Sequence, residues 1–156
     1  MENAAADIVQ ELKKRGSFLM PPADKSEIRR ISDYLHMCGY GRIPDDYAGL
    51  LEKADGIQGP GFILYGTRPQ SFAGGQLIED LFMKTDEALD KSTISEGLML
   101  GEAQGYTVIA YSTENKEYRI LDGLTQDVLY RYKNIEDFII ERVKLRDRIL
   151  NKKNRY

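Results

Sequence analysis

Three aspartates in one short stretch are the first residues of this sequence whose chemistry could define an active site. Asp45 and Asp46 follow Pro44, and Asp55 precedes Gly56. Converging carboxylates can act as a general acid and base or bind Mg²⁺, but either site needs further acidic side chains. Proline is common at the first helical position, and acidic residues in the first turn stabilise a helix by about 0.3–1 kcal/mol each. The pattern therefore favours a helix start over catalysis.

The chain has one histidine, His36, and one cysteine, Cys38. A structural zinc site needs four ligands, and residues two apart on a helix point in different directions. We expect His36 at the surface and Cys38 in the core, on the apolar stripe of its helix. The glycine clusters Gly59-Pro60-Gly61 and Ala73-Gly74-Gly75 match no phosphate-binding loop and are predicted to be turns. We therefore expect no catalytic residue, no metal and no cofactor.

Tyrosine, with ten residues, is the more informative aromatic type here. In the strand predicted at 106–112, alternation puts Tyr106 and Tyr111 on opposite faces. Tyrosines left outside the core would form an amphipathic surface that recognises proteins, or they are ordinary sheet residues with solvated hydroxyls. The pattern does not separate these two readings. The candidate partner-binding residues are Asp45, Asp46, Asp55, Tyr65, Tyr106, Tyr111 and Tyr118.

The elements that must position these side chains begin with helices. Apolar residues spaced at i, i+3, i+4 and i+7 predict them. Asp24 and Glu27 have the spacing of a capping box, and Asn134 is a plausible N-cap for the last helix. The predicted helices carry apolar positions at Ala5–Leu12, Ile28–Cys38, Tyr47–Ala54, Ile78–Leu89 and Ile135–Val143.

Short runs of strand-forming residues predict a sheet. They lie at 62–65, 106–112, 117–121 and 128–132, whereas 67–75 is predicted to be a loop. Strands joined by short loops pair antiparallel. The sequence therefore predicts a single α+β domain in which an antiparallel meander packs with N-terminal helices and a closing C-terminal helix.

Charge is distributed unevenly along the chain. Residues 142–156 hold seven Lys or Arg and one acidic residue, although the whole chain has a formal net charge of -3. The acidic body could attract a basic partner, and the basic end could attract an anion. The longest apolar runs are too short to cross a membrane, and the N-terminus lacks the pattern of a secretory signal. With a single cysteine, a cytoplasmic location is expected.

The order of five sequence segments resembles the SUKH superfamily, which includes the fungal Smi/Knr cell-wall-assembly regulators and bacterial immunity proteins. A leading helix, SEIRRISDYL, is followed by IPDDYAGLLEKADG and the strand GFILYG. LMLGEAQGYTVIAYSTENKEYRILD and KNIEDFIIERV resemble the family's hairpin and closing helix. The motif residues that this resemblance assigns to structure are Pro44, Tyr47, Gly56, Gly66, Gly101 and Phe138.

The resemblance implies a division of the chain and a function. Residues 24–143 would form the SUKH-like domain, 1–23 an additional helix and linker, and 144–156 a basic helix end. The implied activity is non-catalytic binding of a protein, either a toxin encoded nearby, which the chain would neutralise, or a component of cell-wall or glucan synthesis. One departure is Gly105-Tyr106, where the family often has Gly-Asp, which puts any shared polar pocket in doubt.

Two alternatives remain from the residues themselves. The basic C-terminal helix could bind an anion or nucleic acid, although no nucleic-acid motif is present and the domain is acidic overall. Acids near Asp45 and Asp55 could serve a hydrolase if they converged. We expect a protein partner, with nucleic acid less favoured and no membrane association.

Overall fold

The computed structural model describes residues 2–72 and 75–154. Within them the chain forms a single α+β domain, as predicted, in which a meander of antiparallel strands packs with helices. Each predicted helix is present, and the last one extends well beyond Val143. The helices are α1 (Glu2–Lys14), α2 (Lys25–Met37), α3 (Asp45–Leu51), α4 (Leu81–Asp90) and α5 (Ile135–Asn154).

The main sheet of the described residues has seven strands in the order β1-β2-β3-β6-β7-β8-β9, and every neighbouring pair is antiparallel. A separate hairpin joins β4, within the segment predicted to be a loop, to β5, which includes Ile78. The prediction that Ile78 belongs to the fourth helix was therefore wrong, because Asp80 caps that helix and it begins at Leu81. The strands are β1 (Phe18–Leu19), β2 (Ile57–Gly59), β3 (Phe62–Leu64), β4 (Gln70–Phe72), β5 (Gln76–Ile78), β6 (Leu98–Ala103), β7 (Thr107–Ser112), β8 (Glu117–Asp122) and β9 (Val128–Tyr132).

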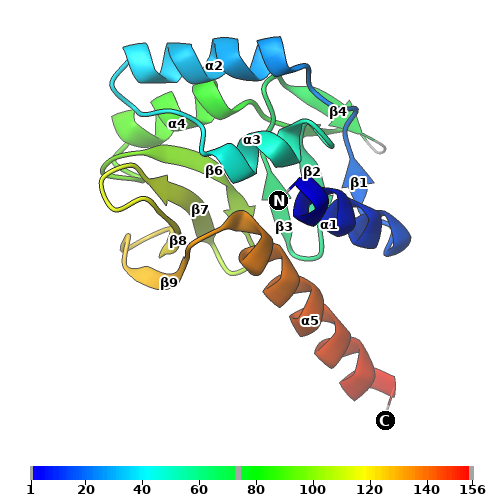
Figure 1. Cartoon of the computed structure of the whole chain (residues 1–156). Helices are drawn as coiled ribbons and strands as arrows, with labels where there is room; N and C mark the ends of the chain where they lie inside the picture. The colour runs from blue at the N-terminus through cyan, green and yellow to red at the C-terminus, as the bar shows by residue number, and fades with distance from the viewer. Residues whose placement is uncertain (1, 73–74, 155–156) are drawn as a thin grey trace.

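The helices surround the sheet unevenly. Figure 1 shows α1, α3 and α5 in front of the sheet, with α2 above α4 at its upper edge. Helix α1 packs on both α3 and α5, and α4 packs on β6. The two upper helices meet through Tyr34 and Phe82, whose ring centroids are 4.8 Å apart. The far half of α5 extends away from the rest of the molecule.

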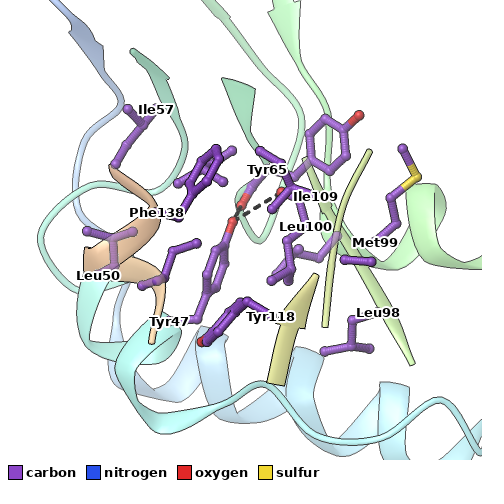
Figure 2. Packing of buried hydrophobic residues seen from close by; sticks show 14 of the residues in the cluster. Tyr47, Leu50, Ile57, Tyr65, Leu98, Met99, Leu100, Ile109, Tyr118 and Phe138 are labelled. Atoms are coloured by element: carbon purple, nitrogen blue, oxygen red, sulfur yellow. Dashed lines mark hydrogen bonds between the residues drawn. The ribbon is translucent and has the colours of Figure 1, made fainter. Parts of the chain in front are cut away.

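The core lies between the sheet and the front helices, and Tyr47 is at its centre. Tyr47 is 1% exposed and lies among other large buried side chains, including Leu50 and Phe138. Its hydroxyl donates hydrogen bonds to the carbonyl oxygens of Tyr65, at 2.6 Å, and Leu100, at 3.3 Å (Figure 2). A buried hydroxyl without such acceptors would be costly. Tyr47 therefore connects α3 to β6 and to the end of β3.

Local sequence explains most element ends. Asn134 accepts a hydrogen bond from the backbone N–H of Asp137, which confirms the predicted cap of α5. Asp80 caps α4 in the same way through Met83. Asp24 occupies the N-cap position of α2, but its side chain makes no capping hydrogen bond, so that part of the prediction was wrong. The turn at Gly59-Pro60-Gly61 joins β2 to β3 as predicted.

Two further sequence predictions need correction or fall outside the structure. Cys38 is exposed, because α2 ends at Met37 and the residue follows the last turn instead of facing the core. His36 is exposed, as predicted. The predicted turn at Ala73-Gly74-Gly75 falls largely outside the described residues.

Candidate interaction surface

Asp46 joins three segments that are distant in the sequence. Its Oδ1 accepts a hydrogen bond from the Tyr118 hydroxyl at 2.5 Å, and its Oδ2 accepts one from the backbone N–H of Ile135 at 2.8 Å. The first-turn aspartate of α3 therefore caps α5. Pro44 occupies the N-cap position of α3, with no side-chain capping hydrogen bond. The expectation that Asp46 caps its own helix was wrong.

Two tyrosines lie beside this carboxylate. The rings of Tyr111 and Tyr118 meet edge to face, with centroids 5.0 Å apart. Tyr118 is buried and Tyr111 is half-buried. Burial and then the charge of Asp46 raise the pKa of Tyr118, and burial followed by the charges of Asp46 and Asp45 raises the pKa of Tyr111. Both phenols therefore stay protonated beside the carboxylates at neutral pH.

Glu136, in the first turn of α5, adds another carboxylate to this site. Burial is the main cause that raises its pKa, and the nearby charge of Asp46 raises it further, against a hydrogen bond from its own backbone N–H. Two carboxylates so close together repel one another. We refer to Asp45, Asp46, Tyr111, Tyr118 and Glu136 as the acid–tyrosine cluster. Sequence reasoning missed Glu136, although its position beside the predicted cap of α5 placed it at a helix start.

The acid–tyrosine cluster adjoins a hollow of about 300 Å³ between α2 and α3. Asp45 is exposed and lines this hollow. The charged residues that line the hollow are Lys25, Arg29, Asp33, Arg42, Asp45 and Glu52. Arg42 is hydrogen-bonded to Asp33, and Lys25 Nζ lies 3.6 Å from Glu52. The acidic surface with its half-buried aromatic ring therefore borders a concave region. Such an arrangement can bind Lys or Arg side chains through charge and through the face of the ring.

Asp55 does not belong to this surface, because its side chain is fully buried. Its carboxylate accepts hydrogen bonds from the Thr67 backbone N–H at 2.6 Å and from the Thr67 hydroxyl at 2.7 Å. Burial raises its pKa, whereas these hydrogen bonds and then the charge of Arg68 lower it. A Cβ at Gly66 would lie 2.6 Å from Oδ1 of Asp55, so glycine is required there. Asp55 therefore anchors the chain after β3, away from solvent.

Three other motif residues lie in the helix-to-strand connection, in the sheet and in the core. Gly56 has a φ of +117°, a backbone conformation that glycine adopts without strain. Gly101 lies in β6 at the irregular pairing with β7. Phe138 is buried, and its ring meets that of Phe62 at 5.4 Å between centroids.

Two more of the predicted partner-binding tyrosines lie elsewhere. Tyr65 is 2% exposed, with Lys84 Nζ located 5.7 Å from its ring centroid. Burial and then the charge of Glu102 raise its pKa. Tyr106 is 85% exposed in the turn before β7, at a φ of +57°. It is five residues from Tyr111, or on the order of 17 Å along an extended strand. Of the seven predicted residues, the structure gathers Asp45, Asp46, Tyr111 and Tyr118.

The carboxylates of Asp45 and Asp55 do not converge on one site. Asp45 is exposed at the start of α3, whereas Asp55 is buried beyond its end. Among the described residues, no group of three or more His, Cys, Asp or Glu side chains is arranged to hold a metal ion. None of the helices in the described ranges is both long and apolar enough to span a membrane. No protein-family model matches the chain, and no curated protein matches it.

Proposed function

We propose that this chain is a non-catalytic protein-binding module that binds a basic partner through the acid–tyrosine cluster. The observation that carries the proposal is the convergence of carboxylates and aromatic rings from α3, from the β7–β8 hairpin and from the start of α5. Hydrogen bonds from Tyr118 and from the N–H of Ile135 hold the Asp46 carboxylate in place among its acidic neighbours.

The geometry supports binding of cationic side chains. Tyr118 and the N–H of Ile135 orient Asp46, and the ring of Tyr118 supports Tyr111. A preoriented aromatic ring loses little conformational entropy on binding, and tyrosine is enriched at the energetic centres of interfaces. Asp45, exposed beside the hollow, adds negative charge that raises the association rate of a basic partner.

The resemblance to the SUKH superfamily supports the choice of partner class. We propose a protein toxin encoded nearby, which the chain would neutralise in the cytoplasm. Regulation of cell-wall or glucan synthesis is the other role that the same resemblance supports. In either role the chain contributes a binding surface and performs no covalent chemistry.

Binding to the products of neighbouring genes tests the proposal. The chain is co-expressed with each toxin-like neighbour, and cell survival and the dissociation constant of the purified pair are measured. We expect rescue by the wild-type chain and at least tenfold weaker binding for Tyr111→Ala, the loss typical of a central interface residue.

Tyr106→Ala is the matched control, since it removes an exposed tyrosine outside the acid–tyrosine cluster. It should change the dissociation constant by less than about twofold, the change typical of residues outside an energetic centre. Asp45→Lys should slow association, most strongly at low salt. Equal losses for Tyr111→Ala and Tyr106→Ala, or no neighbour that binds, would contradict the proposal.

A further inference from the structure

The second half of α5 leaves apolar side chains in solvent. Beyond Val143 the helix extends from the body, as Figure 1 shows in orange and red. Leu145, Ile149 and Leu150 are each 40–44% exposed. At helical spacing, Leu145 and Ile149 continue the side of α5 that carries the buried Phe138. The apolar stripe that packs on the body therefore continues past it, and these three side chains stay partly exposed in the described part of the chain.

This stripe borders a hollow of about 500 Å³. Its walls come from the end of α1, from the start of β1, from the turn between β2 and β3, and from α5. Arg15 in one wall binds Asp147 of α5 through two hydrogen bonds, at 2.5 and 3.1 Å, which holds α5 beside α1. We refer to this site as the basic hollow, and its principal lining residues are Arg15, Gly16, Phe18, Pro60, Arg146 and Leu150.

Positive charge is concentrated in the two chain segments that meet at the basic hollow, and Arg15 and Arg146 are the two cations that line it. Residues 10–18 and 142–152 together hold eight Lys or Arg and only two acidic residues, in a chain of formal net charge -3. Both acids, Glu11 and Asp147, already bind Arg15. Arg146 is exposed, and none of the ion pairs found among the described residues includes it. The local field therefore favours an anionic occupant.

We propose that the basic hollow docks an acidic amphipathic helix of a protein partner. Acidic side chains of that helix pair with Arg146, while its apolar face covers Leu150 and Pro60 in the hollow and reaches Ile149 beside it. Charge complementarity selects the occupant, and burial of the stripe supplies affinity, at about 25 cal/mol per Å² of apolar surface removed from water. This surface lies at the opposite end of α5 from the acid–tyrosine cluster.

The observations favour a protein segment over a nucleic acid. Single-stranded nucleic acid is usually held by several aromatic rings that stack on successive bases, whereas one aromatic residue, Phe18, lines the basic hollow and residues 139–154 contain none. A phosphate backbone would leave Leu145, Ile149 and Leu150 exposed, whereas an amphipathic helix covers them in the usual helix-in-groove mode. A flat membrane cannot enter a concave site between α5 and the β2–β3 turn.

The test uses the full chain and a labelled synthetic 18-residue peptide with leucine on one helical face and glutamate on the other. Fluorescence anisotropy at physiological salt gives the dissociation constant. We expect Arg146→Glu and Leu150→Ala each to weaken binding at least tenfold. Lys144→Glu makes the same charge change two residues away, on the other side of the helix, and should weaken binding less than about twofold, as expected for a charge outside the contact.

Three results would overturn the proposal. They are absence of peptide binding to the wild-type chain, equal losses for Arg146→Glu and Lys144→Glu, and tighter binding of an 18-base-pair DNA duplex or of phosphatidylserine vesicles than of the peptide. Thermal unfolding of each variant confirms that the fold is retained. Tyr111→Ala should leave peptide binding unchanged, so failure here is distinguishable from failure of the proposed function.

Discussion

The side chain of Asp46 in α3 caps α5 through the backbone N–H of Ile135, 89 residues further along the chain, at 2.8 Å. The same carboxylate accepts the hydroxyl of the buried Tyr118. One side chain therefore satisfies two donors from different elements and fixes where α5 begins relative to the sheet.

Replacing Asp46 should destabilise the fold more than replacing its neighbour. Loss of an N-cap costs about 0.5–2 kcal/mol, and a buried donor left unsatisfied costs about 1–3 kcal/mol. Asp46→Ala should therefore lower the free energy of unfolding in urea by about 2–4 kcal/mol. Asp45→Ala is the control, and we expect it to cost no more than about 1 kcal/mol. Similar losses for the two variants would show that Asp46 has no special structural role.

Tyr47→Phe should test the buried hydroxyl at the centre of the core. The substitution keeps the ring and removes the hydrogen bonds to the carbonyl oxygens of Tyr65 and Leu100. We expect the free energy of unfolding to fall by about 1–2 kcal/mol. Tyr130→Phe removes an exposed hydroxyl on β9 and should change stability by less than about 0.5 kcal/mol. An unchanged urea midpoint for Tyr47→Phe would contradict the assigned hydrogen bonds.

Asp55→Ala should be strongly destabilising, because Asp55 has a structural role in the interior and is not a surface residue. The substitution leaves the N–H and the hydroxyl of Thr67 without their acceptor. We expect a loss of about 2–4 kcal/mol, since each buried unsatisfied group costs about 1–3 kcal/mol. Thr67→Val, which removes only the hydroxyl donor, should cost less. Chemical denaturation of the two variants at neutral pH checks the order.

Glu136 should make stability depend on pH in a defined direction. Its pKa in the folded chain is raised above the ordinary value of 4.5, so above pH 4.5 the folded state binds more protons than the unfolded state. The contribution of Glu136 to stability therefore falls as pH rises through that window. Glu136→Gln does not titrate, and its stability relative to wild type should increase from pH 4.5 upward until the folded carboxyl is fully ionised.

Urea unfolding of wild type and Glu136→Gln at several pH values measures this difference. Glu114→Gln, at an exposed position in the β7–β8 turn, provides the matched control. A difference between Glu136→Gln and wild type that stays constant with pH would contradict the raised pKa of Glu136, which comes first from burial and then from the charge of Asp46.

Cys38 should react in the native protein. It is exposed after the end of α2, so a thiol reagent needs no unfolding to reach it. We expect maleimide to label the folded chain within about twofold of the rate for the urea-unfolded chain, as for any accessible thiol. Labelling only in urea would show that Cys38 is buried in the native protein, as the helical stripe predicted, and would contradict its exposed position.

The sequence was most informative where apolar periodicity was long. The apolar stripes identify α1, α3 and α5 because each contains several repeats. Strands β7 and β8 are identified by their content of Val, Ile and Tyr, which favour strands. Strands β1, β2, β4 and β5 have two or three residues each, too few to show a period. Strand β6 was not predicted because its buried run of Leu98, Met99 and Leu100 contains no β-branched or aromatic residue, the types that favour a strand.

The candidate site was predictable only in part. Asp45, Asp46, Tyr111 and Tyr118 stood out by residue type, but pairing between Asp46 and Tyr118 depends on how α3 packs on β8, 72 residues away. Asp55 followed a helix and preceded glycine, a pattern typical of an exposed helix end. Its burial follows from Thr67, which β3 brings back beside it. The spacing of residues within one segment does not predict contacts between segments that are distant in the sequence.

Helix α5 is held at two places, by Asp46 at its first residue and by Arg15 at Asp147, and its 20 residues span about 30 Å. A tilt of about 5° about Ile135 would displace the far end by about 2–3 Å, because a helix of this length moves as a rigid rod. A partner that shifts the capped end therefore also changes the width of the basic hollow between Leu150 and Pro60. The two ends of the molecule are mechanically coupled through one helix.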